Sequence, residues 1–336
     1  MPTIKRGSSA ILPQGVLLGH QSNKVAATGC TVVLCPDGAV GSVAVRGGAP
    51  ATRETDLLAP ENLVEQVHAV LISGGSAFGL DAASGVMQYL EEKSHGFSFG
   101  QAVVPIVVGA SLFDLDVGSA TIRPDASMGY AAAASASECI QSTGNVGAGT
   151  GASVGRFLGS YSAMKGGVGI ASTQVNDLLV SAVVAVNSLG NVFDRVNNRF
   201  LAGARIEQDG VQVIAEPTEV LPDLLCPQKE LGKQATAART NTTIGVVITN
   251  ATLCKAKALR AVSMAHDGLA RTIYPAHTSF DGDALFALAT GKVPAEQNVV
   301  GMLAALAVEQ AILDAVTSAK EAYGLPSAHS FLGKKQ

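Results

Sequence analysis

Short runs of β-branched and apolar residues recur along the chain and alternate with longer segments that carry apolar residues at helical spacing. Apolar runs of about four to eight residues between turn signals are typical of buried strands, and apolar positions three and four apart are typical of helices. Because such strands alternate with apolar helices, we expect two sheets packed face to face with helices outside them. The predicted strands are 30–35, 40–45, 68–73, 103–108, 168–172, 178–186, 211–215, 243–249 and 284–289, and the predicted helices are 78–93, 128–140, 255–273 and 298–323.

Glycine and proline set the expected connections between these elements. Pro36-Asp37-Gly38 separates the first two apolar runs, so we expect those runs to form a β-hairpin. Gly74-Gly75 leads from the third strand into the first helix, with Ser76 as the expected N-cap. A strand, glycine turn and helix in this order can hold an anion on helix N–H groups. No Gly-Lys-Ser/Thr sequence follows, so we assign no phosphate site.

A second glycine-rich stretch, residues 144–155 (GNVGAGTGASVG), has the glycine spacing of a dinucleotide-binding loop. No strand leads directly into it, and no acidic residue ends a second strand, so we reject that interpretation and expect no cofactor. We expect these glycines to let the backbone approach a substrate or another strand closely.

The composition favours an oligomer. Hydrophobic residues make up 47% of the 336 residues and charged residues only 15%. So few charges leave little to cover the surface of a monomer, and we therefore expect a homo-oligomer that buries part of its apolar exterior. The formal net charge is −4 and no basic cluster occurs, which argues against nucleic acid as a partner.

Cysteine usage and hydropathy indicate a compartment. The five cysteines are odd in number, and their spacing completes no metal-binding pattern, so we expect free thiols in a reducing compartment and no metal. The N-terminus lacks the apolar core of a signal peptide. The longest apolar run, 299–308, is too short to cross a membrane. A cytoplasmic protein without membrane contact is the expectation.

The junction at Asn241-Thr242 carries the candidate chemistry. A polar, proline-bearing segment at about 216–240 precedes it, and a β-branched run follows it, so a hydroxyl residue begins a core strand directly after a loop. If the Asn241–Thr242 bond were cut, Thr242 would carry a hydroxyl and a free α-amine with a reference pKa of about 7.7–8.0. A threonine whose own amine serves as base is a known way to activate a weak hydroxyl nucleophile. An ordinary loop-to-strand junction would show the same three residues.

Seven segments, in order and spread over nearly the whole chain, resemble the self-processing peptidases that include DmpA-type D-aminopeptidases, β-peptidyl aminopeptidases and nylon-oligomer (6-aminohexanoate-oligomer) hydrolases. The Asn-Thr-Thr junction is most similar to the nylon-oligomer hydrolases, since the aminopeptidase branches commonly use serine. The segments are Val45-Arg46-Gly47-Gly48-Ala49-Pro50, Gly74-Gly75-Ser76-Ala77-Phe78-Gly79-Leu80, Gly144-Asn145-Val146-Gly147-Ala148-Gly149-Thr150-Gly151, Met164-Lys165-Gly166-Gly167, Val184-Ala185-Val186-Asn187, Asn241-Thr242-Thr243 and His277-Thr278-Ser279-Phe280-Asp281-Gly282-Asp283.

The resemblance implies an α/β (α+β) fold, a four-layer αββα sandwich of the DmpA and ornithine-acetyltransferase type that belongs with the N-terminal-nucleophile hydrolases. It also implies a single domain over 1–336 that cuts itself into fragments 1–241 and 242–336, which stay together as one unit. The expected homo-oligomer is a tetramer of such cleaved units. Extracting the new N-terminal strand from the core would expose apolar surface at roughly 25 cal/mol per Å². The implied function is hydrolysis of a small-molecule amide or short peptide.

Catalytic roles follow from the resemblance, position by position. Thr242 matches the nucleophile, and Asn187 matches the asparagine whose amide donates to the oxyanion. Asp281 and Asp283 match the acidic pair that orients the nucleophile and its amine. From the residues alone, Phe-Asp-Gly-Asp could equally be a polar turn before the next strand. His277, just before the pair, is a candidate to orient it.

Two positions depart from the family pattern. Arg156 stands where the family has a lysine, which keeps the positive charge but removes a group able to lose a proton. Phe113 stands where the nylon-oligomer hydrolases have a tyrosine near the nucleophile, so a hydroxyl donor is missing from the expected substrate site. Lys165 lies nearby in sequence and could supply a cation to the substrate, or could be a solvated surface lysine.

Two other interpretations stay open from the sequence. The ornithine acetyltransferases share this fold and an N-terminal threonine, so the chain could transfer an acyl group to an amine rather than to water. It could also be an inactive member that acts as a binding protein, with Arg156 and Phe113 as marks of lost activity.

Overall fold

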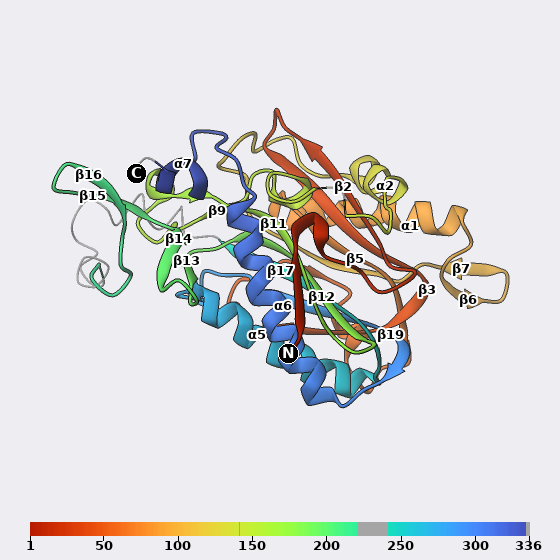
Figure 1. Cartoon of the computed structure of the whole chain (residues 1–336). Helices are drawn as coiled ribbons and strands as arrows, with labels where there is room; N and C mark the ends of the chain where they lie inside the picture. Colours follow the sequence, from red (N-terminus) through yellow and green to blue (C-terminus); the bar gives the residue numbers. More distant parts are fainter. Residues whose placement is uncertain (141, 221–240, 334–336) are drawn as a thin grey trace.

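One large sheet organises the molecule, in a computed structural model that describes residues 1–140, 142–220 and 241–333 (Figure 1). Within these ranges ten strands are hydrogen-bonded in the order β1-β11-β12-β17-β19-β3-β5-β8-β4, and β2 pairs with β3 as well. The strands are β1 (Thr3–Arg6), β2 (Leu17–Asn23), β3 (Thr28–Val45), β4 (Thr52–Arg53), β5 (Gln66–Ser73), β8 (Val107–Ser111), β11 (Gly167–Val175), β12 (Leu178–Asn187), β17 (Thr242–Thr252) and β19 (Ala284–Pro294).

Among the described residues, four helices flank this sheet and a short one lies near the C-terminus. They are α1 (Ala82–Glu92), α2 (Ala126–Ala134), α5 (Lys255–Thr272), α6 (Gln297–Thr317) and α7 (Ala328–Leu332). Smaller sheets pair β6 (Phe97–Phe99) with β7 (Ala102–Val104), β9 (Ser153–Val154) with β10 (Met164–Lys165), β13 (Asn191–Asp194) with β14 (Arg199–Ala202) and β18 (Ile273–Tyr274), and β15 (Arg205–Gln208) with β16 (Val211–Ile214). Short 3-10 helices include η3 (Ser76–Asp81), which runs directly into α1.

The sheet folds over on itself at β3, which produces the layers. The first part of β3 pairs with β5, the last part pairs with β19, and the register shifts between Leu34 and Ala39. Residues that alternate along β12 and β17 therefore face two cores. Val183 and Val246 lie in the core between the two halves of the sheet, whereas Val184 points into the core against α5 and α6.

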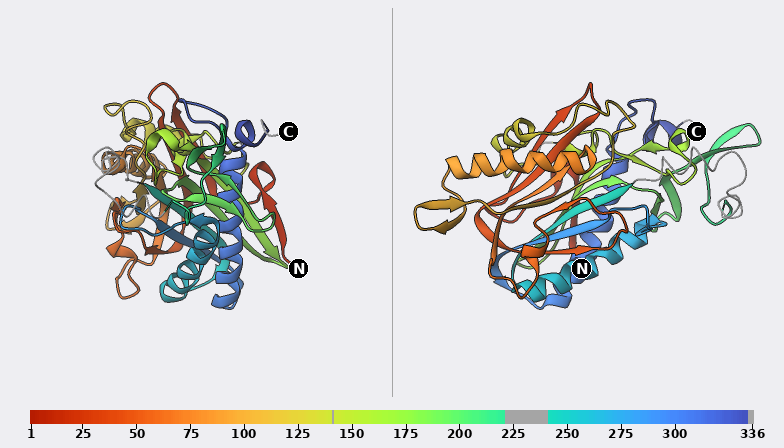
Figure 2. Two further views of the ribbon diagram at one scale, coloured as in Figure 1. Left: turned by 90° about the vertical axis from the view of Figure 1, so that its left-hand side faces the viewer. Right: turned by 180° about the vertical axis from the view of Figure 1, so that it is seen from behind.

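The second half of the sheet is covered in the same way on its outer side. Leu71 of β5 packs with Val86 and Leu90 of α1, and Ala132 and Ala133 of α2 belong to the same buried cluster. From α5 and α6 to α1 and α2, the order of layers is helix, sheet, sheet, helix (Figure 2). The expected αββα sandwich is therefore what the structure shows.

Several local expectations need correction. The runs around Pro36-Asp37-Gly38 are not a hairpin but one long strand, because the turn residues fall at a register shift in β3 and both flanking runs pair with other strands. Ser76 is not the N-cap of α1, which begins after Asp81; Ser76 opens η3 with φ of 55° instead. The strand expected at 103–108 is broken between β7 and β8, since Pro105 cannot donate a ladder hydrogen bond.

Helix α6, at the position of the long helix expected at 298–323, is apolar and buried along most of its length. In the described part of the chain it is the one helix long and apolar enough, by length and composition alone, to cross a membrane. Of its most apolar 18-residue window, 83% is buried inside the molecule. Most of α6 lies against β11, β12 and α5, so its hydropathy reflects its place in the core.

Candidate active site

Strand pairing brings the candidate residues to one end of the sheet. β12 and β17 are antiparallel, and their register places Asn187, the last residue of β12, opposite Thr242, the first residue of β17. β17 and β19 are parallel, with Ile244 opposite Ala284. The residues just before β19 therefore lie beside the start of β17, where Asn241 forms a single parallel bridge to Asp281.

The Thr242 hydroxyl lies against the peptide bond that precedes it. Thr242 is only 4% exposed, and its Oγ1 donates to the carbonyl oxygen of Asn241 at 2.5 Å. The backbone N–H of Gly282 donates to the same oxygen at 2.8 Å. The Asn241 carbonyl thus receives two hydrogen bonds, one of them from the candidate nucleophile.

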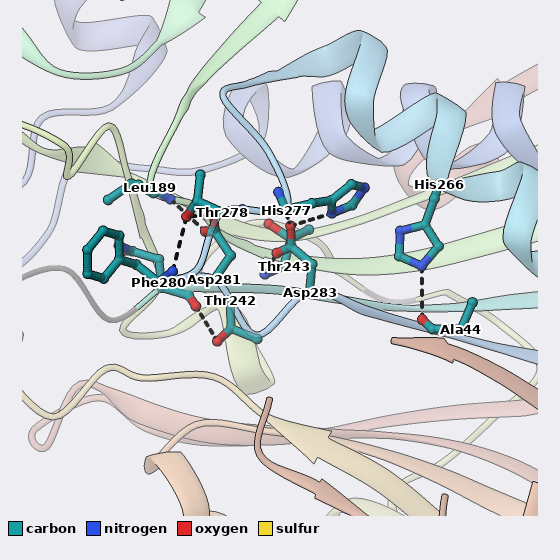
Figure 3. A network of polar contacts seen from close by, with 11 residues as sticks. Ala44, Leu189, Thr242, Thr243, His266, His277, Thr278, Phe280, Asp281 and Asp283 are labelled. Carbon is teal, nitrogen blue, oxygen red and sulfur yellow. Dashed lines mark hydrogen bonds and ion pairs between the residues drawn. The ribbon is translucent and has the colours of Figure 1, made fainter. Parts of the chain in front are cut away.

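The carboxylates of Asp281 and Asp283 accept hydrogen bonds from different partners (Figure 3). Asp283 Oδ1 accepts from the backbone N–H of Thr243 at 2.8 Å, which ties the second residue of β17 to the acidic pair. Asp281 Oδ2 accepts from the N–H of Thr278 at 3.0 Å and from its hydroxyl at 2.5 Å. Burial, and then the charge of Asp283, raise the pKa of Asp281 to about 6.

Two histidines stand behind Asp283. His277 donates to Asp283 Oδ2 from its backbone N–H at 3.0 Å, and its Nδ1 lies 2.9 Å from the same oxygen. The ring of His266 on α5 packs edge-on against the ring of His277, with centroids 4.8 Å apart. His266 Nε2 lies 2.9 Å from the carbonyl of Ala44, so Nε2 carries the proton; burial lowers the pKa of His266 to about 4. His277 does contact the acidic pair, as its place in the sequence indicated.

The side-chain amide of Asn187 has a defined orientation. Its Oδ1 accepts from the backbone N–H of Ser153 at 2.9 Å, and because that group can only donate, the opposite atom is the Nδ2 donor. Nδ2 donates to the carbonyl oxygen of Phe113 at 2.9 Å. Phe113 therefore meets the site through its backbone, in addition to the half-buried ring that replaces the expected tyrosine.

Arg156 lies behind Asn187. It is 1% exposed, and it donates to Ser153 Oγ at 3.3 Å and to Ser160 Oγ at 2.8 Å, with an ion pair to Asp116. Ser153 Oγ in turn lies 3.4 Å from Asn187 Oδ1. Burial lowers the pKa of Arg156 to about 10, so the guanidinium stays charged at neutral pH. The structure connects Arg156 to Asn187 through Ser153.

Lys165 is fully buried, so the solvated alternative considered from the sequence is wrong. Its Nζ donates to the carbonyl oxygens of Gly149, Ala152 and Gly166 at 2.8, 2.8 and 3.1 Å, which uses all three ammonium protons. Burial lowers the pKa of Lys165 to about 7, and the charge of Asp114 opposes that shift. The glycine-rich stretch 144–155 thus wraps a cation with its backbone.

Asp114 is a buried residue that the sequence did not single out. Its Oδ1 accepts from the N–H of Gly75 and its Oδ2 from the hydroxyl of Thr28, both at 2.7 Å. A Cβ on Gly74 would lie 2.1 Å from Asp114 Oδ2, which explains the glycine there. The anion at this glycine turn is therefore a carboxylate of the chain itself, and burial raises its pKa to about 6.

The motif Val45-Arg46-Gly47-Gly48-Ala49-Pro50 lies against the loop that carries Asp281 and Asp283. The N–H groups of Arg46 and Gly47 donate to the carbonyl of Asp283, and that of Ala49 donates to the carbonyl of Asp281. A Cβ on Gly47 would lie 2.3 Å from backbone atoms of both aspartates. The segment is a backbone brace for the acidic loop.

The expected polar linker and the arrangement of possible metal ligands can be described only for part of the chain. Most of the polar linker expected at about 216–240 falls outside the described residues, which resume at Asn241. Within the described ranges, no group of three or more His, Cys, Asp or Glu side chains is arranged to hold a metal ion.

Comparison with known proteins decides the family. The sequence model of peptidase family S58 matches residues 13–329. The chain belongs to peptidase family S58. An uncharacterized aminopeptidase of Mycobacterium tuberculosis is 44% identical over 317 residues, covering 90% of this chain and 89% of that protein. A 6-aminohexanoate-oligomer endohydrolase of a Kocuria species is 29% identical over 306 residues, covering 90% and 81%.

Solved structures of other proteins share the S58 chain's fold. A β-aminopeptidase of a Burkholderia species superposes with a TM-score of 0.68 at 19% identity, covering 98% of this chain and 94% of that one. The L-aminopeptidase D-Ala-esterase/amidase of Ochrobactrum anthropi, a variant of the Ntn hydrolase fold, gives 0.67 at 16% identity, covering 97% and 92%. The fold expected from the sequence is confirmed, and membership of S58 places the chain among amide- and peptide-bond hydrolases.

Proposed function

We propose that this S58 chain cuts its own Asn241–Thr242 bond and then hydrolyses small amides or short peptides with Thr242 as an N-terminal nucleophile. The observation that carries the proposal is the buried Thr242 hydroxyl, 2.5 Å from the oxygen of the preceding carbonyl and beside two aspartates. The fragments would be 1–241 and 242–336, held together by β17, which lies in the middle of the large sheet.

In the first reaction, Thr242 Oγ1 bonds to the carbonyl carbon of Asn241 while the C–N bond breaks, and the hydroxyl proton ends on the departing Thr242 nitrogen. Water then adds to the ester: its OH completes the carboxylic acid of Asn241, and its remaining proton restores the Thr242 hydroxyl. The product is an N-terminal threonine with a free amine.

In the second reaction, the amine of Thr242 accepts the hydroxyl proton as Oγ1 attacks the carbonyl carbon of a substrate amide. The substrate C–N bond then breaks and the amine passes that proton to the leaving nitrogen. Water hydrolyses the resulting ester: its OH completes the carboxylic acid of the product, and its remaining proton restores the Thr242 hydroxyl. The Asn187 amide donates to the developing oxyanion, a contribution worth about 3–4 kcal/mol of barrier. Asp281 and Asp283 hold the ammonium that forms, and Arg156 supports Asn187 through Ser153. Lys165 stiffens the glycine-rich wall beside the site rather than touching substrate directly.

The substrate class rests on the relatives. The M. tuberculosis relative at 44% identity is named an aminopeptidase, and the Kocuria relative at 29% is named a 6-aminohexanoate-oligomer endohydrolase. We therefore propose short peptides and linear aliphatic amides as substrates.

Denaturing electrophoresis and mass spectrometry test the proposed self-cleavage. The wild type is expected to give two fragments, one beginning at Thr242, and Thr242→Ala to remain one inactive chain of 34.0 kDa. Fully active wild type that stays uncut would refute it.

We also propose a cytoplasmic homo-oligomer, a tetramer of cleaved units. Charged residues are 15% of the chain, and Phe97 and Phe99 are exposed on the β6–β7 hairpin, which extends away from the body of the molecule (Figure 1). The cysteines in the described ranges, Cys30, Cys35, Cys139 and Cys254, are free, which suits a reducing compartment. Light scattering of the purified protein measures the assembly, and a monomeric mass at working concentration would contradict it.

A further inference from the structure

The carbonyl of the proposed scissile bond already has a fixed donor, and that donor is not Asn187. Gly282 N–H lies 2.8 Å from the Asn241 oxygen, in the position of an oxyanion donor. Asn187 Nδ2 instead donates to the carbonyl oxygen of Phe113 at 2.9 Å. The two groups stand on different sides of Thr242, since Gly282 belongs to the loop before β19 and Asn187 to β12.

We propose that the two reactions of Thr242 use different oxyanion donors: the Gly282 N–H in self-cleavage and the Asn187 amide in substrate turnover. This assignment rests on the proposed function. In self-cleavage the negative charge develops on the Asn241 oxygen, which the Gly282 N–H already contacts. In turnover that oxygen belongs to the new C-terminal carboxylate of the 1–241 fragment and is no longer bonded to Thr242, and an incoming substrate carbonyl meets Asn187.

The site also leaves no room for a side chain at Gly282. A Cβ built on it would lie 2.7 Å from Thr242 Oγ1, 3.2 Å from Thr242 Cγ2 and 2.8 Å from the carbonyl oxygen of Ala49. Separations under 3.0 Å force something to move, and Ala49 is held by its own hydrogen bond to the Asp281 carbonyl. Even one methyl group would therefore displace the nucleophile from the carbonyl that it attacks.

The scissile residue itself is held by its backbone rather than by its side chain. The N–H of Asn241 donates to the Phe280 carbonyl at 3.1 Å, and its carbonyl receives Gly282 and Thr242. Both polar atoms of its buried side-chain amide lack a hydrogen-bond partner among the described residues. The clamp recognises the peptide group and not the asparagine, so Asn241→Ala is expected to cut itself at a rate close to that of the wild type.

Rates of self-cleavage and of amide hydrolysis, measured on the same preparations, test the division. Asn187→Ala is expected to cut itself within a few-fold of the wild type while turnover falls about 10²- to 10³-fold. Gly282→Ala is expected to remain a single folded chain. Gly245→Ala is the matched control. Its added methyl on β17 would lie 2.8 Å from the end of the Leu285 side chain and 3.1 Å from the Val183 carbonyl oxygen, and none of its three nearest atoms belongs to Thr242. This variant is expected to cut itself.

The possible outcomes distinguish a failure of the donor assignment from a failure of the proposed function. Self-cleavage of Asn187→Ala that is slowed as much as its turnover would overturn the division, and so would a Gly282→Ala chain cut at the wild-type rate. If Gly282→Ala does not fold, as judged by circular dichroism, the Asn187→Ala comparison decides alone. An uncut but active wild type would remove the proposed function, whereas cleaved wild type with either adverse result removes only the donor assignment.

Discussion

The contact between His277 and Asp283 makes a specific kinetic prediction. Asp283 Oδ1 holds Thr243 N–H at 2.8 Å, and Oδ2 receives both the backbone and the ring of His277. Replacing the ring by His277→Ala leaves the backbone donor but frees one side of the carboxylate. The Asp283 carboxylate is then free to rotate and to weaken its hydrogen bond to Thr243, next to the proposed nucleophile Thr242. His277 would therefore act as a positioning residue.

The size of the effect follows from the bond that is lost. A hydrogen bond to a charged group contributes about 1.5–3 kcal/mol, and each 1.4 kcal/mol corresponds to about tenfold in rate. His277→Ala is therefore expected to lower kcat by about 10- to 100-fold, with KM little changed because the ring faces the carboxylate and not the substrate. His277→Asn can place an amide N–H near the position of Nδ1 and tolerates the left-handed φ of 58° at this residue, so it should restore much of kcat.

Steady-state kinetics on a short amide substrate, with the fraction of cleaved chain determined for each variant, measures this directly. His329→Ala, an exposed histidine of α7, is the control and should match the wild type. Thermal midpoints show whether a loss of rate is merely a loss of folding. A His277→Ala enzyme within twofold of the wild type, or one that His277→Asn fails to improve, would refute a positioning role.

Three further predictions concern buried charges, the first two measured as urea midpoints in the uncleaved Thr242→Ala background. Burial lowers the pKa of Lys165 from 10.5 to about 7, so between these pH values the folded state binds fewer protons than the unfolded state. The free energy of unfolding should therefore rise with pH in that range, and Lys165→Met should reduce this rise. The pKa of Asp281 is raised from 3.8 to about 6. Its stabilisation of the folded state is therefore fully present below pH 3.8 and is lost as pH rises through 6, which lowers the free energy of unfolding by up to about 3 kcal/mol. Asp281→Asn should remove this dependence of stability on pH. Arg156→Lys should lower kcat several-fold without unfolding the chain, because an ammonium cannot reach Ser153, Ser160 and Asp116 together as the guanidinium does; unchanged kcat would contradict this.

The sequence predicted most of the sheet because its strands carry their own signal. β12 and β17 are rich in Val, Ile and other small or apolar residues and are buried along most of their length, as strands covered on both faces are. The hairpin prediction failed at β3 because Pro36-Asp37-Gly38 has the same local chemistry in a turn and at a register shift in a bent strand. Which of the two forms depends on distant partners, β5 and β19, that no local pattern specifies.

The candidate site divides in the same way. The Asn-Thr-Thr junction and the Asp-Gly-Asp loop are local motifs, and their resemblance to a family identified them. The sequence leaves two alternatives for Lys165, a cation at the substrate site or a solvated surface residue. It does not decide between them because the path of the loop that supplies the carbonyl partners of Lys165 is not specified by a local pattern. Asp114 carried no motif of its own, although Gly74-Gly75 did signal that an anion could bind there.

The acidic pair has opposite consequences before and after the proposed cut. In the uncut chain the nitrogen of Thr242 is a neutral amide, so the repulsion between Asp281 and Asp283 and their burial are met chiefly by hydrogen bonds, and the pKa of Asp281 rises. Cleavage would turn that nitrogen into an amine with a reference pKa of about 7.7–8.0, which the proposed mechanism pairs with the two carboxylates. An ammonium there favours the ionised form of Asp281 and is itself stabilised by the pair. The same two side chains that destabilise the precursor at neutral pH therefore retain the new terminus in the mature enzyme, which gives self-cleavage an electrostatic driving force and keeps β17 in its sheet.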